Sequence, residues 1–84
     1  MKVEVYSSKS CGPCKVFKIY EVPKLEEAGI SVVVHDIDTD AGRELAMSNR
    51  VRAVPTINVF KGDGFIRSFV GMTKASEIID VLGV

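Results

Sequence analysis

The sequence predicts an α/β fold with a mixed four-stranded sheet and helices on both of its faces. Segments of helical periodicity alternate with short β-branched runs, and the last two runs are separated by a glycine-containing turn. A strand, a helix and a second strand in succession form a unit with parallel strands. With 84 residues, of which 46% are hydrophobic and 26% charged, the chain has the size and composition of one globular domain. We therefore predict the element order β-α-β-α-β-β-α in a single domain, residues 1–84.

The first helix contains a proline in its interior. Residues 3–6 predict a short strand, and residues 11–28 predict a helix that ends at Gly29, a residue favoured just beyond a helix. Because Pro23 has no N–H to donate along the helix, it is expected to kink the helix near Ile19. The apolar residues of this helix form one stripe with two more residues beside it: Val16, Ile19, Tyr20 and Pro23, then Phe17 and Leu25.

The second strand and the second helix follow directly. Residues 31–37 form a nearly continuous β-branched run, which predicts a strand that is buried on both faces. Asp38, Thr39 or Asp40 is expected to cap the next helix, which ends near Arg50.

The last part of the chain predicts a hairpin and a final helix. Residues 56–60 and 65–70 have the composition of strands, and the turn 61–64 joins them. Thr73 is expected to cap the final helix. The apolar residues of that helix follow the spacing of one buried face: Ala75, Ile78, Ile79 and Leu82.

The charge pattern argues against two classes of partner. Eleven Lys and Arg residues balance eleven Asp and Glu residues, and no basic block is present, so nucleic-acid binding is not expected. No run approaches the roughly 20 apolar residues of a membrane span. The first residues alternate like a strand and do not resemble a signal peptide, so we expect a cytoplasmic protein with no membrane partner.

Cys11 and Cys14 are the only cysteines, and their spacing favours reversible redox chemistry. A permanent disulfide across so short a loop removes only about 2 kcal/mol of chain entropy, against roughly 4.7 kcal/mol for a 100-residue loop. A zinc site needs four ligands, and with His35 as the only histidine it would require a carboxylate or solvent. A cluster that bridges two chains stays open as an alternative. On a helix, the spacing i, i+3 brings the two Cα atoms to about 5–6 Å, within the range of a disulfide.

Cys11 is predicted to lie at the start of the helix, where the thiolate form is stabilised. Free N–H groups and the positive end of the helix dipole favour a negative charge there. Lys9 and Lys15 can add to this effect, whereas Lys18 more simply solvates the helix. Cys14 lies one turn deeper and is expected to be less exposed. We therefore assign the attack on a disulfide to Cys11 and the resolution of the intermediate to Cys14.

Several motifs together resemble the thioredoxin family over nearly the whole chain. The dithiol motif is Cys11-Gly12-Pro13-Cys14-Lys15, and Val54-Pro55-Thr56 is similar to the cis-proline segment of the family. Phe60-Lys61 with the turn glycines Gly62 and Gly64, followed by Phe69-Val70-Gly71, resembles the closing hairpin of the family and the glycine after it. Ile37-Asp38 matches the end of the central strand of the family. The resemblance implies the thioredoxin fold. It also implies a cis bond before Pro55, whereas base rates alone favour trans, since only about 5–6% of such bonds are cis.

The chain also departs from the family at specific positions. A typical thioredoxin begins with an additional strand and helix, so in length this chain is closer to glutaredoxins and to the small glutaredoxin-like hydrogen donors of ribonucleotide reductase. Ser10 stands where thioredoxins have Trp, and Val5 and Val34 stand where they have a buried Asp and a Lys. Without that pair, water or another group must accept the proton of Cys14. Residues 70–73 lack the glutathione-binding pattern of glutaredoxins, so we give the motifs more weight than the length.

The resemblance implies a thiol–disulfide oxidoreductase that reduces protein disulfides through a mixed disulfide at Cys11. Substrate contacts are expected from Gly12, Pro13, Val54, Pro55 and Gly71. No bound cofactor is implied, and electrons from NADPH would arrive through a flavin-dependent thioredoxin reductase. Expected partners are this reductase and disulfide-containing proteins such as ribonucleotide reductase, with the protein itself a monomer. Two alternatives are a glutaredoxin-like donor that uses glutathione and a binding module bridged by a metal or cluster.

Overall fold

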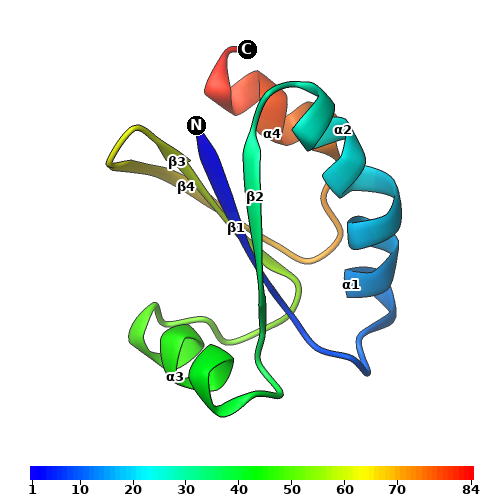
Figure 1. Ribbon diagram of the computed structural model, residues 1–84, viewed down its shortest axis with the longest axis vertical. Helices are drawn as coiled ribbons and strands as arrows, with labels where there is room; N and C mark the ends of the chain where they lie inside the picture. The colour runs from blue at the N-terminus through cyan, green and yellow to red at the C-terminus, as the bar shows by residue number, and fades with distance from the viewer.

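The structure, a computed structural model, describes every residue of the chain and confirms the predicted order of strands and helices. The elements are β1 (Lys2–Ser7), α1 (Gly12–Val16), η1 (Phe17–Glu21), α2 (Val22–Glu27), β2 (Ser31–Asp36), α3 (Asp40–Ser48), β3 (Thr56–Lys61), β4 (Gly64–Val70) and α4 (Ala75–Leu82). The four strands form one sheet in the order β2-β1-β3-β4 (Figure 1). β1 and β2 are parallel, and the other two pairs are antiparallel, so the sheet is mixed as predicted.

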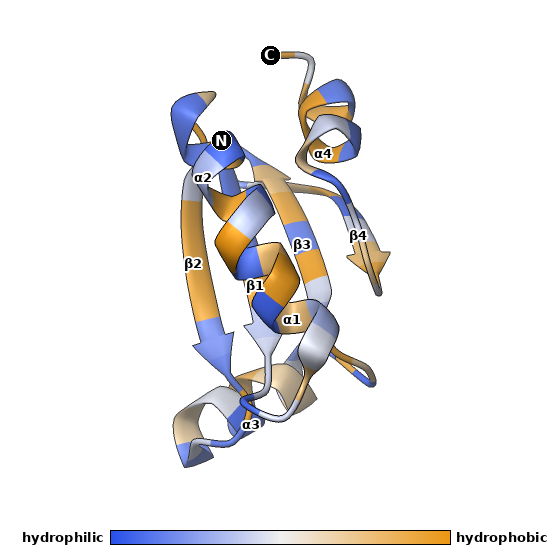
Figure 2. Ribbon diagram, turned by 90° about the vertical axis from the view of Figure 1, so that its right-hand side faces the viewer, coloured by the Kyte–Doolittle hydropathy of each residue, from blue (hydrophilic) through white to orange (hydrophobic).

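Helices cover both faces of the sheet, but unequally. In Figure 1, α1, η1, α2 and α4 lie on one side of the sheet, and α3 lies on the other side near one end. Figure 2 shows the first helix in front of the sheet, with apolar residues of β2 and β3 on either side of it. The core between them consists of ten buried residues: Val3, Val5, Phe17, Leu25, Ile30, Ile57, Val59, Ala75, Ile78 and Leu82. None of the helices has the length and apolar character needed to cross a bilayer.

The first helix continues from α1 through η1 to α2, and η1 is a π-helical turn. The backbone N–H of Val22 donates to the carbonyl of Phe17, a step of five residues where an α-helix has four. Pro23 follows at once and has no N–H for the carbonyl of Ile19. A π turn therefore lies at the place where a kink was predicted. Gly29 follows the helix with a φ of 82°, as expected for a residue beyond a helix end.

The sheet contacts a different face of this helix from the predicted apolar stripe. Val16, Ile19 and Tyr20 are 40%, 64% and 62% exposed, and Pro23 is exposed as well. The buried residues of the helix are Cys14, Phe17, Glu21 and Leu25. Helical periodicity identified two neighbouring apolar faces, but it contains no information on which of them meets the sheet.

β2 is an edge strand, so the prediction that it is buried on both faces is wrong. It pairs with β1 only, and Val33 and Val34, which point to opposite faces, are 40% and 43% exposed. The short helix α3 covers only one end of its face of the sheet (Figure 1). A β-branched run suits the pleated surface of any strand, so composition does not distinguish an edge from a central position.

The caps of the last two helices were predicted with different success. Thr39 caps α3 as expected, since its Oγ1 accepts the backbone N–H three residues further on at 3.0 Å. The prediction that Thr73 caps α4 is wrong, because the N-cap residue is Lys74, whose N–H donates to the Glu77 carboxylate at 2.9 Å. The hydroxyl of Thr73 instead donates to the carbonyl of Gly71 at 3.0 Å. The Glu77 carboxylate, in the first turn of α4, therefore provides the capping hydrogen bond that was expected from the Thr73 hydroxyl.

Candidate active site

Cys11 and Cys14 are joined by a disulfide at the start of α1. Their Cα atoms are 5.2 Å apart, as the spacing i, i+3 predicted. Cys11 is the N-cap residue, with extended backbone angles, and Pro13 occupies the first turn, where its missing N–H leaves no bond unmade. Cys11 is partly exposed, whereas Cys14 is 0% exposed. The difference in exposure predicted for the two sulfurs is therefore present.

The surroundings of the Cys11 sulfur favour negative charge. The backbone N–H of Cys14 donates to this sulfur at 3.2 Å, in the position of an N-cap hydrogen bond. The first turn of α1 contains no acidic residue. Lys9, Lys15 and Lys18 lie nearby in sequence, and none of them forms an ion pair with a carboxylate. An N–H donor at a helix start favours a thiolate over a thiol at such a position once the disulfide is reduced.

The loop that leads into Cys11 is held by Asp38, a contact that the sequence analysis did not predict. The Asp38 carboxylate accepts the hydroxyl of Ser8 at 3.1 Å and the backbone N–H of Lys9 at 3.0 Å. The Lys9 N–H, helped by Ser8, holds the pKa of the Asp38 carboxyl below its ordinary value. The carbonyl of Ser8 in turn accepts the N–H of Cys11 at 3.2 Å. The parallel pairing of the first two strands indicates this contact, because residues that follow two neighbouring parallel strands meet at one edge of the sheet. Ser8 and Lys9 follow β1, and Asp38 follows β2.

The bond between Val54 and Pro55 is cis, so the base-rate expectation of trans is wrong and the expectation from the family resemblance is confirmed. Pro55 is buried, and its carbonyl accepts the backbone N–H of Gly71 at 2.8 Å. Gly71 has a φ of 86°, in the left-handed region that side chains disfavour. The hydroxyl of Thr56 donates to the carbonyl of Ala53 at 2.6 Å and closes the turn before β3.

The sheet brings these segments to one end of the molecule. Tyr6 near the end of β1 pairs with Thr56 at the start of β3, and Thr56 pairs with Val70 at the end of β4. The segments that follow β1 and β4 or precede β3 contain all the predicted site residues, with three of them in the first turn of α1: Cys11, Gly12, Pro13, Cys14, Val54, Pro55 and Gly71. Gly12 and Pro13 are exposed, and Val54 and Gly71 are half-buried, so all four have surface accessible to solvent.

His35 lies outside this site, as a structural strand residue. Its Nε2 is 3.2 Å from Oε1 of Glu4, and its ring centroid is 5.0 Å from that of Tyr6. Burial, with the Glu4 charge adding to it, raises the pKa of the Tyr6 hydroxyl. No group of three or more His, Cys, Asp or Glu side chains is arranged to hold a metal ion.

Comparison with known proteins identifies the family to which the dithiol motif belongs. The sequence model named Thioredoxin matches residues 2–83. The chain belongs to the thioredoxin family. Putative thioredoxin 2 of Streptomyces coelicolor is 32% identical over 74 residues, which are 87% of this chain and 54% of that protein. Mitochondrial thioredoxin of Bos taurus is 30% identical over 77 residues, 87% of this chain and 44% of that one. The chain thus spans about half the length of these two thioredoxins.

Solved thioredoxins have the same fold. Thioredoxin 1 of Thermosipho africanus superposes with a TM-score of 0.84 at 22% identity, over 99% of this chain and 91% of that one. The thioredoxin fold predicted from the motifs is therefore confirmed. The motifs, and not the glutaredoxin-like length, identified the family correctly.

Val5 and Val34 stand at the two positions where the sequence analysis noted an Asp and a Lys in thioredoxins. Val5 is 0% exposed in the core, and Val34 is 43% exposed on the edge strand. Neither side chain can accept or donate a proton. Glu21 is a buried carboxylate on the same helix face as Cys14, but the backbone N–H of Ala75 occupies its Oε1 at 2.9 Å. Neither valine can therefore take the proton of Cys14, as predicted from the sequence.

Proposed function

We propose that the protein is a thiol–disulfide oxidoreductase that reduces disulfides in other proteins. The observation that carries this proposal is the Cys11–Cys14 disulfide at a helix start, with one sulfur accessible and the other enclosed. An accessible thiolate is required for attack, and an enclosed neighbour is required for release. The membership in the thioredoxin family supports the same reaction.

The reaction begins with the reduced protein and an oxidised target. The Cys11 thiolate attacks one sulfur of the target disulfide, a new S–S bond forms to Cys11, and the second target sulfur leaves as a thiolate that takes a proton from water. Cys14 then loses its proton to water and attacks the Cys11 sulfur. This step closes the Cys11–Cys14 disulfide and releases the first target sulfur as a thiolate. Two electrons have passed from the dithiol to the target disulfide.

The exposed surface around the dithiol supports contact with an extended peptide. Val54 makes no backbone hydrogen bond within the chain, so its N–H and carbonyl are free to pair with a target strand. Gly12, Pro13 and Gly71 add surface without large side chains. We place the target peptide against these four residues.

The simplest test of the reaction uses two single substitutions. Cys11→Ser is expected to abolish the reduction of a small protein disulfide, followed as thiol release. Cys14→Ser keeps the attacking sulfur and is expected to accumulate a mixed disulfide, visible as an adduct by mass spectrometry under non-reducing conditions. If Cys14→Ser turned over at the wild-type rate, or if the adduct formed on Cys14 in Cys11→Ser, the assigned roles would be wrong.

The source of electrons defines the second test. We propose a flavin-dependent thioredoxin reductase that uses NADPH, and the targets include proteins such as ribonucleotide reductase in the cytoplasm. Turnover is measured with NADPH and thioredoxin reductase, and in parallel with glutathione and its reductase. Turnover with the first system supports the proposal, whereas turnover with glutathione alone assigns the protein to the glutaredoxin-like alternative.

A further inference from the structure

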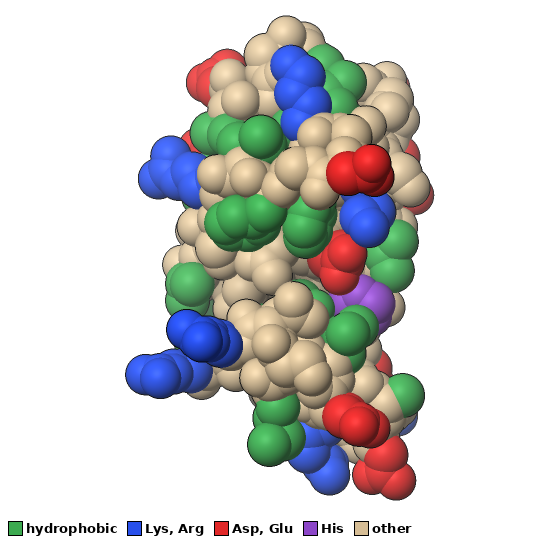
Figure 3. All heavy atoms as spheres, turned by 90° about the vertical axis from the view of Figure 1, so that its left-hand side faces the viewer, with side chains coloured by type: hydrophobic (Ala, Val, Ile, Leu, Met, Phe, Trp, Pro, Cys, Tyr) green, Lys and Arg blue, Asp and Glu red, His purple; other side chains and the backbone are tan.

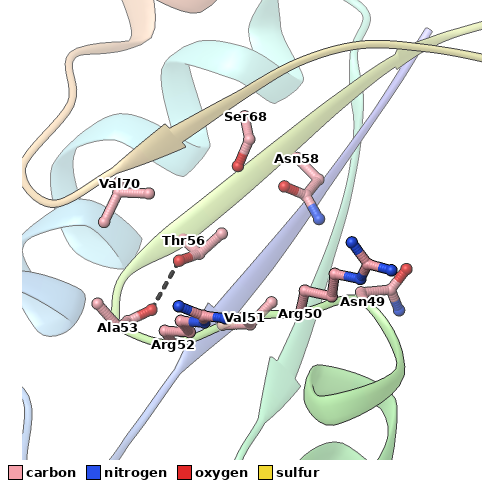
Figure 4. A pocket seen from close by; sticks show the side chains of 9 residues that line it. All are labelled: Asn49, Arg50, Val51, Arg52, Ala53, Thr56, Asn58, Ser68 and Val70. Atoms are coloured by element: carbon pink, nitrogen blue, oxygen red, sulfur yellow. Dashed lines mark hydrogen bonds between the residues drawn. The ribbon is translucent and has the colours of Figure 1, made fainter.

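A polar pocket lies on the α3 side of the sheet, away from the core helices. It has a volume of about 240 Å³ and lies between the segment 49–53, which follows α3, and strands β3 and β4 (Figure 4). The thiol–disulfide reaction proposed above uses none of its charged or amide side chains.

The floor of the pocket contains polar groups without protein partners. Asn58 is 8% exposed, yet its side-chain amide makes no hydrogen bond with any other residue. No fully enclosed polar atom in the chain lacks a partner, so this amide must face the pocket space. Ser68 pairs with Asn58 across the two strands, and its hydroxyl also has no protein partner. In Figure 4 both side chains point toward the segment 49–53.

The opposite wall supplies positive charge. Arg50 and Arg52 are the only charged residues that line the pocket, and neither forms an ion pair. Figure 4 shows the Arg50 guanidinium and the Asn58 amide pointing toward each other. Glu4 on β1 pairs in register with Asn58, but its carboxylate binds Lys2 and His35.

Charged side chains of both signs surround this face. Figure 3 shows Lys and Arg side chains projecting from the side of this face opposite the single His, whereas the side with the His has Asp and Glu side chains together with Lys or Arg. The pocket therefore combines two unpaired cations with unpaired amide and hydroxyl groups, and no anion lines it.

The backbone of Arg50 is unusual for a residue with a side chain. Its φ is 58°, and it is the only non-glycine residue of the chain in the left-handed region. It follows the end of α3 at a position where glycine is favoured. A side chain at such a position is disfavoured relative to glycine, so the guanidinium is present despite the backbone preference.

We propose that this pocket binds a small ligand through a phosphate group. A phosphate monoester carries nearly two negative charges, which matches the two guanidinium groups, and its three terminal oxygens can accept from the guanidinium forks, the amide and the hydroxyl together. Since a water molecule occupies about 30 Å³, a pocket of 240 Å³ has room for the phosphate group and a small organic body.

The test is a titration of the oxidised full chain, followed by NMR of backbone and side-chain amides at constant ionic strength. The probes are inorganic phosphate, glycerol 3-phosphate and malonate. Saturable shifts are expected at the Asn58 side-chain amide and at the backbone of 49–53. Saturation by glycerol 3-phosphate at lower concentration than by inorganic phosphate would show that the pocket also uses the organic body. Equal concentrations would identify free phosphate as the ligand.

The decisive variant is Arg50→Gly. Because glycine relieves the left-handed backbone, this variant is expected to unfold at the same temperature as the wild type or higher, while its phosphate affinity falls about tenfold or more. Arg43→Gln removes a guanidinium of α3 outside the pocket and is expected to bind as the wild type does. An unchanged affinity in Arg50→Gly, shifts without saturation, or tighter binding of malonate than of either phosphate would overturn the proposal.

Discussion

The carboxylate of Glu21 accepts a hydrogen bond of 2.9 Å from the backbone N–H of Ala75, the first residue of α4. Glu21 is only 8% exposed, and Lys24 Nζ lies 3.7 Å from the same oxygen. The contact joins the π turn of the first helix to the start of the last one, and both helices pack on the same face of the sheet. A carboxylate at a helix start satisfies a free N–H and lies at the positive end of the helix dipole, which explains how this charge is accommodated in a buried position.

Replacing Glu21 by Leu is expected to lower the free energy of unfolding by about 1.5–3 kcal/mol, because the buried N–H of Ala75 then has no acceptor. Glu21→Gln keeps an acceptor oxygen and is expected to lose less. Urea unfolding measures both. Glu27→Leu on the exposed side of α2 is the control, and an equal loss in this variant would show that the effect comes from the surface leucine and not from the hydrogen bond.

Gly42 and Gly12 are expected to respond oppositely to alanine. In a helix, Gly→Ala ordinarily stabilises by about 1 kcal/mol. At Gly42, within α3, a Cβ atom would overlap the carbonyl of Asp36, so Gly42→Ala is expected to destabilise by about 1–3 kcal/mol. At Gly12 a Cβ atom meets nothing within 4 Å, and Gly12→Ala is expected to be neutral or stabilising. Thermal unfolding of the two variants tests this, and equal effects at the two positions would contradict the packing argument.

The sequence predicted the elements and the dithiol because both depend on local patterns. Pro13 in the first turn and Gly29 beyond the last one bound the first helix, and the spacing of Cys11 and Cys14 alone determines that their sulfurs can meet. The order of elements and the hairpin follow from periodicity and turn residues in the same way. These features require no information about distant parts of the chain.

What the sequence could not predict depends on tertiary contacts. The faces of the first helix that contain Val16 and Phe17 are both apolar, and only packing on the sheet decides that Phe17 is buried. The β-branched composition of β2 suits an edge or a central strand equally, and only the strand order of the sheet places β2 at the edge. The acceptors Glu21 and Asp38 act on backbone groups 54 and 29 residues away, so no local pattern indicates Glu21, and only the parallel pairing of β1 and β2 indicates Asp38.

Glu4 is expected to make stability depend on acid pH. Burial raises the pKa of its carboxyl, but hydrogen bonds with Lys2 and His35 outweigh this effect and hold the pKa below its ordinary value of 4.5. Because the folded pKa is depressed, the carboxylate stabilises the fold fully above the unfolded value, and this contribution is lost as the pH falls through the folded value. Glu4→Gln is therefore expected to unfold at lower urea concentration than the wild type at neutral pH. The difference between the two should shrink below pH 4.5.

The matched control for this pH dependence is Glu44→Gln, an exposed position on α3 that forms no ion pair. Its urea midpoint is expected to follow that of the wild type at every pH. If the gap between Glu4→Gln and the wild type stayed constant down to acid pH, the effect would come from packing around the side chain and not from its charge.

Asp38 is expected to order the loop that carries Cys11. Its carboxylate accepts the N–H of Lys9 at 3.0 Å, and this bond is the main cause of its lowered pKa, with the Ser8 hydroxyl adding to it. In Asp38→Ala the Lys9 amide loses its acceptor, so its hydrogen exchange is expected to speed up, while amides in the centre of β3 keep their protection. Asp38→Asn retains one acceptor oxygen and should fall between the two. In the wild type, carboxyl NMR should place the pKa of Asp38 below 3.8, and Ser8→Ala should raise it only in part, since the Lys9 N–H remains. Lys9 exchange that is insensitive to Asp38→Ala would show that the loop is held from elsewhere.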